Sequence, residues 1–233
     1  MQVFDGDSAF PSALEPDQRW KELILVFATF FLPGFLLQGQ QGSGSAFSDP
    51  MYLTSVLLQA LPQSILLIYI VQIGEKGNLE NFGFRRLRWG DLPRGVLVCV
   101  ATFVVVIPMQ ALLPSGSERT ASLSFSNPAL LVLVLATTMA AAYREEVFFR
   151  AYAVTRLQQM GTGPVVAIAT TSIVFGAGHL YQGIAGLAIS ASIGLLMAAV
   201  FVRTRSLHAL GIGHGLYNFI VLLAGSETFW LPR

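Results

Sequence analysis

Charged side chains are scarce in this chain. Asp, Glu, Lys and Arg make up 12% of its 233 residues, against about 25% in typical soluble domains. Hydrophobic residues account for 54%. This composition excludes an ordinary soluble domain and indicates an integral membrane protein. The net charge is only +1, and the one connection that mixes basic and aromatic residues, 75–95, suits an anionic headgroup surface, so no nucleic-acid partner is expected.

Cysteine is nearly missing as well. Cys99 is the single one, so no disulfide can form within the chain, and its apolar surroundings favour a small buried side chain over a reactive thiol. A signal-peptide pattern is also lacking, because no basic residue precedes Arg19. Residues 1–22 are therefore expected to be a disordered cytoplasmic lead.

Long apolar runs are what the chain does have. About 20 residues of helix cross a bilayer, and only helices suit runs that do not alternate between polar and apolar residues. The sequence therefore predicts an all-α, polytopic transmembrane helix bundle with about seven spans, eight being the alternative. It forms one integral membrane domain, residues 23–225, followed by a short tail, 226–233. The runs are 23–37, 51–73, 95–113, 127–157, 164–180, 184–202 and 206–225.

The basic residues predict how the bundle is oriented. Twelve of the 14 Lys and Arg residues fall before the first run, between the second and third, around the end of the fourth, or between the sixth and seventh. Cytoplasmic connections carry this excess of positive charge. The N-terminus is thus expected in the cytosol and the C-terminus on the opposite side, in a bacterial inner membrane.

The fourth run contains charges where a membrane span should have none, in the segment "REEVFFR". Charged residues inside a span cost about 2.5 to 3.5 kcal/mol each on insertion scales and usually serve a function. Glu146 and Arg150 are four residues apart, so they lie on one helical face and can form an ion pair. Glu145 is rotated by about 100° from Glu146 and lacks that partner. The two carboxylates should therefore have different roles, one held ionised and one able to exchange protons.

Two further runs contain polar residues at a matching depth. The turn "GTGP" predicts a helical hairpin about Thr162, with Glu145 and His179 each seventeen residues from it. A carboxylate beside an imidazole can activate water. His214 and Asn218 share a face of the last run, roughly 13 and 20 Å from its cytoplasmic end. We therefore expect one polar cavity, with glycines beside both histidines letting the helices approach closely.

Other residues near these positions have simpler interpretations. Phe175 precedes His179 by four residues and is expected to pack beneath its ring. Arg144 is expected to form a pair or to face the cavity rather than to act in catalysis, and His208 is expected at the membrane interface.

Three short motifs together resemble one family. "EEVFFR" with Glu145, Glu146 and Arg150, "FGAGH" with Phe175 and His179, and "HGLYN" with His214 and Asn218 look like the EExxxR, FxxxH and HxxxN motifs of the CPBP family. This family contains the type II CAAX prenyl endopeptidases and the Abi, or bacteriocin-processing, proteins. The resemblance covers about residues 127–223, the expected catalytic core. Two departures are the span count, usually eight, and Ala151, where Gly often follows the motif Arg.

The resemblance implies an intramembrane endopeptidase of glutamate type that works without a metal. Glu145 would be the general base, acting with His179 on the attacking water. His214 and Asn218 would bind the oxyanion, while Glu146 and Arg150 would hold the site together. The substrate would be a membrane peptide or a lipidated protein, with a prenylated CAAX tail as one candidate.

Three alternatives remain open at this stage. A zinc protease could use His179, His214 and Glu145 as ligands, although the HExxH motif is missing. A transporter or proton relay would also place Glu, His and Arg in the membrane, although no pair of broken helices in two related halves is present. A non-catalytic membrane scaffold or regulator could retain the same residues.

Overall fold

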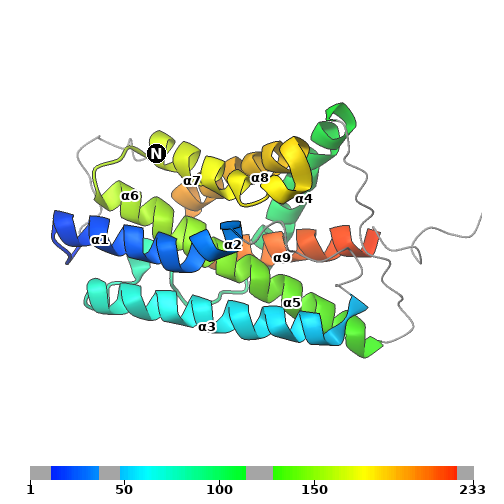
Figure 1. The fold of residues 1–233 in the computed structure, drawn as a ribbon, viewed down its shortest axis with the longest axis horizontal. Coiled ribbons are helices and arrows are strands. Elements are labelled where there is room, and N and C mark those ends of the chain that lie inside the picture. Colours follow the sequence, from blue (N-terminus) through cyan, green and yellow to red (C-terminus); the bar gives the residue numbers. More distant parts are fainter. Residues whose placement is uncertain (1–11, 37–47, 114–127, 225–233) are drawn as a thin grey trace, which may run out of the picture.

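The structure is a computed structural model that describes residues 12–36, 48–113 and 128–224. Within these residues the regular elements are helices (Figure 1). Apart from one short 3₁₀ helix, η4 (Glu80–Phe82), they join into seven continuous helical segments. In chain order the elements are α1 (Pro16–Val26), the π-helix η1 (Phe27–Phe31), α2 (Leu32–Leu36), α3 (Pro50–Gly74), the short 3₁₀ helix η4 (Glu80–Phe82), α4 (Asp91–Leu112), α5 (Pro128–Glu145), the π-helix η5 (Glu146–Val154), α6 (Thr155–Gln159), α7 (Pro164–Ala177), the 3₁₀ helix η6 (Leu180–Gln182), α8 (Gly183–Thr204) and α9 (Leu207–Ala224).

Each helical segment corresponds to one of the apolar runs, so the predicted all-α bundle is confirmed. Four described helices are long and apolar enough to cross a membrane: Pro50–Gly74, Asp91–Leu112, Leu180–Thr204 and Leu207–Ala224. Helix α7 is apolar but shorter, with 14 residues. The molecule is therefore an integral membrane protein, and the count of seven membrane spans stays a prediction.

The N-terminal lead differs from its prediction. Helix α1 begins at Pro16, so residues 16–22 are helical and not disordered. Glu15 and Gln18 form a capping box, each side chain bonding the other's backbone, and Pro16 occupies the first helical position, where its missing N–H costs nothing. Glu is an uncommon N-cap residue, which is why the sequence did not mark this start. The first eleven residues and the tail, 226–233, lie outside the described residues.

The segment with the motif glutamates runs through the middle of the bundle. In Figure 1, α5, η5 and α6 form one continuous helix, with α3 along one side and the α7–α8 pair on the other. Helix α9 packs against both α4 and α5. Because other helices surround η5, all of its residues are buried.

Glycines allow these helices to approach closely. A Cβ added to Gly213 of α9 would lie 2.7 Å from the carbonyl oxygen of Gly95 in α4, and one added to Gly176 of α7 would lie 2.7 Å from that of Leu187 in α8. Any larger residue would force the backbones apart. The predicted close approach beside both histidines is therefore present.

A buried arginine fastens the N-terminal helix to the end of the central helix. Arg156 donates to Glu22 of α1 at 2.6 Å and to Glu75, which follows α3, at 2.5 Å. Burial acts to raise the pKa of Glu75, but hydrogen bonds from Ser12, Arg156 and the Ala13 backbone outweigh it and lower the pKa below its usual 4.5. This polar cluster links α1, α3 and α6 at one end of the bundle.

Candidate active site

The helix changes character where the motif begins. Helix α5 ends at Glu145, and the π-helix η5 starts at Glu146 without a break in the chain's helical path. In a π-helix the hydrogen bonds run from residue i to i+5, a rare geometry that occurs most often at functional sites. The local backbone thus singles out the same residues as the sequence motif.

Glu146 and Arg150 form the ion pair that their spacing predicted. Arg150 Nη1 donates to Glu146 Oε1 at 2.9 Å, and at most 1% of either side chain is exposed. The guanidinium also lies over the Phe175 ring, 4.5 Å from its centre. Breaking such a buried pair would leave an uncompensated charge, so this pair is suited to holding η5 in place.

His214 joins α9 to both glutamates. Its Nδ1 is 2.8 Å from Glu146 Oε1, and its Nε2 is 3.7 Å from Glu145 Oε2. A carboxylate accepts hydrogen bonds, so Nδ1 must carry a proton and Nε2 is the nitrogen that faces Glu145. The sequence placed His214 in the same cavity as the glutamates but did not predict this bridge, which depends on the rotation of α9 relative to α5.

Glu145 has a different environment from its neighbour. Its side chain is 22% exposed, and its closest ionic partners, Arg144 and His214, lie at 3.8 and 3.7 Å. Both distances exceed hydrogen-bonding range. Arg144 therefore forms a pair, as expected, and Glu145 keeps its oxygens available to other groups.

His179 follows the end of α7, next to the aromatic centre of the site. Its Nδ1 is 2.9 Å from the carbonyl oxygen of Phe175, which can only accept, so Nδ1 carries the proton and Nε2 bears the lone pair. Phe175 is 2% exposed, and its ring centre is 4.9 Å from that of His179 and 6.1 Å from that of His214. Phe175 packs against His179, as expected.

Glu145 and His179 are connected through two other side chains, His214 and Phe175. The recorded contacts lead from Glu145 to His214, then to Phe175, and from there to His179. A water shared by Glu145 and His179 stays a prediction. Asn218 lies one helical turn beyond His214 on α9, where it is partly exposed, and its part in the site also stays a prediction.

A metal centre is not preformed by the described side chains. Among the residues that the structure describes, His, Cys, Asp and Glu do not gather in a group of three or more that could hold an ion. His179, His214 and Glu145 thus do not make a ready set of zinc ligands in the part of the chain that the structure describes.

Glu145, Glu146 and His214 thus form a polar centre within a helical membrane bundle, and His179 lies next to it across the Phe175 ring. Residues 127–220 match the family model described as "Type II CAAX prenyl endopeptidase Rce1-like". This match supports the resemblance to the family carried by the three motifs and points to a peptidase. No curated protein and no solved structure was found to match the chain.

Proposed function

We propose that this protein is an intramembrane endopeptidase in which Glu145 activates a water molecule to hydrolyse a peptide bond of a membrane-associated substrate. The observation that supports this most directly is the contrast between the two glutamates. Glu146 is fully buried and engaged by Arg150 and His214, whereas Glu145 is partly exposed and has no hydrogen bond to these partners. A general base must be reachable by water and free to accept a proton.

In this mechanism Glu145 takes a proton from water while the lone pair of His179 Nε2 orients the same molecule. The hydroxyl oxygen attacks the carbonyl carbon of the scissile bond, and the carbonyl oxygen becomes an oxyanion. Glu145 then gives its proton to the departing amide nitrogen, and the C–N bond breaks. The hydrogen bond from His179 Nδ1 to Phe175 supports this assignment, because it leaves Nε2 as the basic nitrogen.

His214 and Asn218 would stabilise the oxyanion. His214 Nδ1 is already occupied by Glu146, so donation to an oxyanion must come from Nε2 and requires a doubly protonated ring. The Glu146 carboxylate, 2.8 Å from Nδ1, holds the ring with Nε2 turned toward Glu145. Glu146 would therefore support the reaction through His214, in addition to pairing with Arg150.

Replacing each glutamate by glutamine tests the division of roles. Glu145→Gln should abolish cleavage and leave thermal unfolding in detergent unchanged, because its carboxylate makes no close hydrogen bond in the described contacts. Glu146→Gln should lower the free energy of unfolding by about 3 kcal/mol or more, since Arg150 would be left as a buried, uncompensated charge. Retained cleavage by Glu145→Gln would contradict the proposal.

The substrate class can be found with the same variant. Membrane proteomes of cells with the wild-type protein and with Glu145→Gln should differ in peptides whose new termini depend on that carboxyl group. A farnesylated peptide that ends in Cys, two aliphatic residues and any last residue is the first purified candidate. If the two proteomes are identical, a scaffold function is favoured instead.

Metal dependence separates this mechanism from the zinc alternative. We expect activity to survive prolonged treatment with a strong chelator, because Glu145 and His179 activate the water without a Lewis acid. Loss on chelation and recovery with Zn²⁺ would show that His179, His214 and Glu145 bind a metal that activates the water. Substrate-driven proton flux in liposomes would instead favour the transporter alternative.

A further inference from the structure

We propose that Tyr143 and His208 form a positioning pair that fixes Glu145 relative to His214 and ties this geometry to the connection before α4. The proposal rests on the proposed function of Glu145. Neither residue belongs to the three sequence motifs, and neither contacts the reacting groups directly. They act through the helices that carry those groups.

The Tyr143 ring lies at the contact between α5 and α9. A Cβ added to Gly211 would be 2.7 Å from Tyr143 Cε2 and Cζ, so the ring occupies the space that only a glycine leaves on α9. Tyr143 precedes Glu145 by two residues on the same helix. A shift of the ring against α9 therefore moves the glutamate with it.

His208 holds the hydroxyl end of that ring. The Tyr143 hydroxyl oxygen is 3.3 Å from His208 Nδ1, and the ring centres are 6.0 Å apart. His208 Nε2 is 2.6 Å from the carbonyl oxygen of Arg85, so Nε2 must be the protonated nitrogen and donate. Nδ1 then has the lone pair and accepts the Tyr143 hydroxyl proton, while the His208 backbone carbonyl oxygen also faces this hydroxyl at 3.5 Å.

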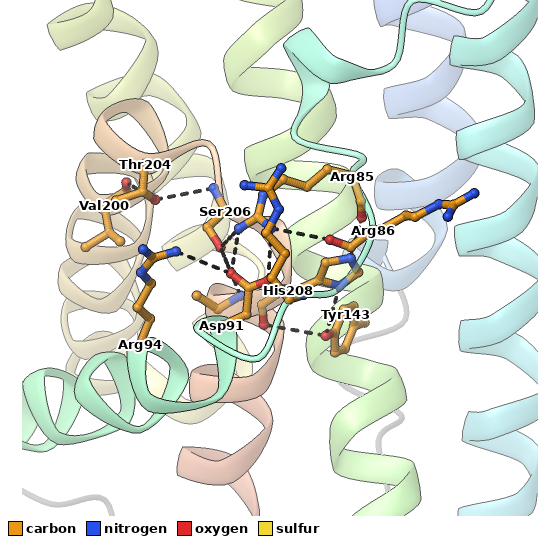
Figure 2. A network of polar contacts seen from close by, with 11 residues as sticks. Arg85, Arg86, Asp91, Arg94, Tyr143, Val200, Thr204, Ser206 and His208 are labelled. Atoms are coloured by element: carbon orange, nitrogen blue, oxygen red, sulfur yellow. Dashed lines mark hydrogen bonds and ion pairs between the residues drawn. The ribbon is translucent and has the colours of Figure 1, made fainter.

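The Arg85 end of this link is rigid. Arg85 forms two hydrogen bonds to Asp91, at 2.9 and 2.5 Å, and the Asp91 side chain is fully buried. Ser206, in the turn before α9, donates to the same carboxylate at 2.9 Å (Figure 2). Bidentate, charge-assisted bonds of this kind are strong and directional. The start of α9 is thus anchored twice, by Ser206 to Asp91 at the start of α4 and by His208 to Arg85 in the connection before α4.

Figure 2 shows Tyr143 on its helix reaching toward His208, which lies between it and the Arg85–Asp91 cluster. His208 precedes His214 by six residues, or about 9 Å of helix. The Arg85–Asp91 cluster therefore fixes the position of α9 along its axis, and the contact between Tyr143 and His208 fixes α5 relative to α9. The separation of Glu145 and His214 follows from these two constraints.

Three variants test the pair. Tyr143→Phe removes only the hydroxyl. His208→Gln keeps an amide donor near the position of Nε2 for the Arg85 carbonyl but removes the acceptor at Nδ1. The third is the double variant. Tyr69→Phe is the matched control, because Tyr69 lies on α3 and is 57% exposed. Each is measured as full-length protein in detergent for kcat, KM and thermal unfolding with the farnesylated peptide.

We expect each single variant to lower kcat about fivefold, the loss of one hydrogen bond, with KM and the unfolding temperature unchanged. The double variant should be no worse than either single, since both remove the same bond. The proposal would be overturned by an unchanged kcat, or by a loss of kcat that lower stability explains. It would also be overturned by a loss of about 25-fold in the double variant, because that is the product of two independent fivefold losses.

A second measurement needs no substrate. In amide hydrogen exchange, Tyr143→Phe and His208→Gln should speed exchange across residues 144–150, while Tyr69→Phe should not. Exchange equal to wild type in the first two variants would also overturn the positioning role. Should Glu145→Gln remain active, the proposed function would fail, yet the exchange result would still show whether the pair holds the helix.

Discussion

Glu145 and Glu146 show how one helical step separates two functions. The rotation of about 100° between neighbours turns the Glu146 carboxylate toward Arg150 and His214. It leaves the Glu145 carboxylate partly exposed beside Arg144. The π-helical start at Glu146 adds to this difference, because its wider turn changes the side-chain directions from that residue on. Two identical side chains can therefore have different roles, with Glu146 stabilising the helix and Glu145 available for chemistry.

Asn218 offers a clean test at this scale. It lies one turn from His214 and is partly exposed, so its removal should not disturb the core. Asn218→Ala should lower kcat by about 10²- to 10³-fold, the usual effect of losing one oxyanion donor, with little change in stability. The exposed Asn78 gives a matched control: Asn78→Ala should keep full activity. Full activity of Asn218→Ala would remove it from the oxyanion site.

Some of these residue contacts followed from sequence spacing and some did not. The Glu146–Arg150 pair and the packing of Phe175 against His179 are contacts within one helix or just past its end, where a four-residue spacing fixes the geometry. The bridge from His214 to the glutamates and the bond from His208 to Arg85 join different elements. Their formation depends on how α9 is rotated, which no spacing within α9 records. His208 was expected only to lie at the membrane interface.

The helices around the site are placed by small residues as much as by large ones. Helix α9 brings His214 to the glutamates because Gly211, Gly213 and Gly215 let it approach α4 and α5. Gly213→Ala should lower the free energy of unfolding by about 1 to 3 kcal/mol, since the new Cβ would meet the Gly95 carbonyl oxygen at 2.7 Å. Thermal unfolding in detergent measures this change.

Gly34 supplies the control for that substitution. It lies in α2, and a Cβ there would have nothing within 4 Å among the described atoms. Gly34→Ala should therefore be neutral or slightly stabilising, because alanine favours a helix over glycine. Equal losses from both variants would mean that helix propensity, and not the contact between α4 and α9, controls the result.

Element positions were predictable where hydrophobicity marked them. All seven apolar runs became helical segments, because a run of this length has no other way to satisfy its backbone in lipid. The start of helix α1, residues 16–22, was missed because these residues are mostly polar and gain their order from contacts distant in sequence, chiefly Glu22 with Arg156. The π-helical geometry of η5 was also not predictable, since no residue type encodes it.

At the scale of the whole molecule, the cluster around Arg156 ties the N-terminal helix to the rest. The pKa of Glu75 is lower in the folded protein than its usual 4.5, so its contribution to stability is complete above pH 4.5 and declines as the pH falls through the folded value. Unfolding temperature measured from pH 6 to pH 3 should therefore drop. Glu75→Gln should be less stable at pH 6 and show a shallower drop.

Glu80 is the control for that experiment, because it lies in the same connection and is exposed. Glu80→Gln should follow the wild-type curve at every pH. If Glu75→Gln also follows it, the carboxylate of Glu75 does not contribute to the stability of the fold, and the N-terminal helix is held by its other contacts, such as Glu22 with Arg156.

The orientation of the bundle is the last property that the charges predict. Even with Arg144 and Arg150 left out because they lie in the site, ten of the other 12 basic residues fall on one side when the seven segments are threaded in order, which predicts the N-terminus in the cytosol and the C-terminus outside. In a bacterial host, alkaline phosphatase fused after the chain should be active and green fluorescent protein at the same site should be dark. Both reporters inserted after Lys76 should behave in the opposite way. A fluorescent C-terminal fusion would require an even number of spans, because an odd number cannot return the chain to the cytosol, and would favour eight.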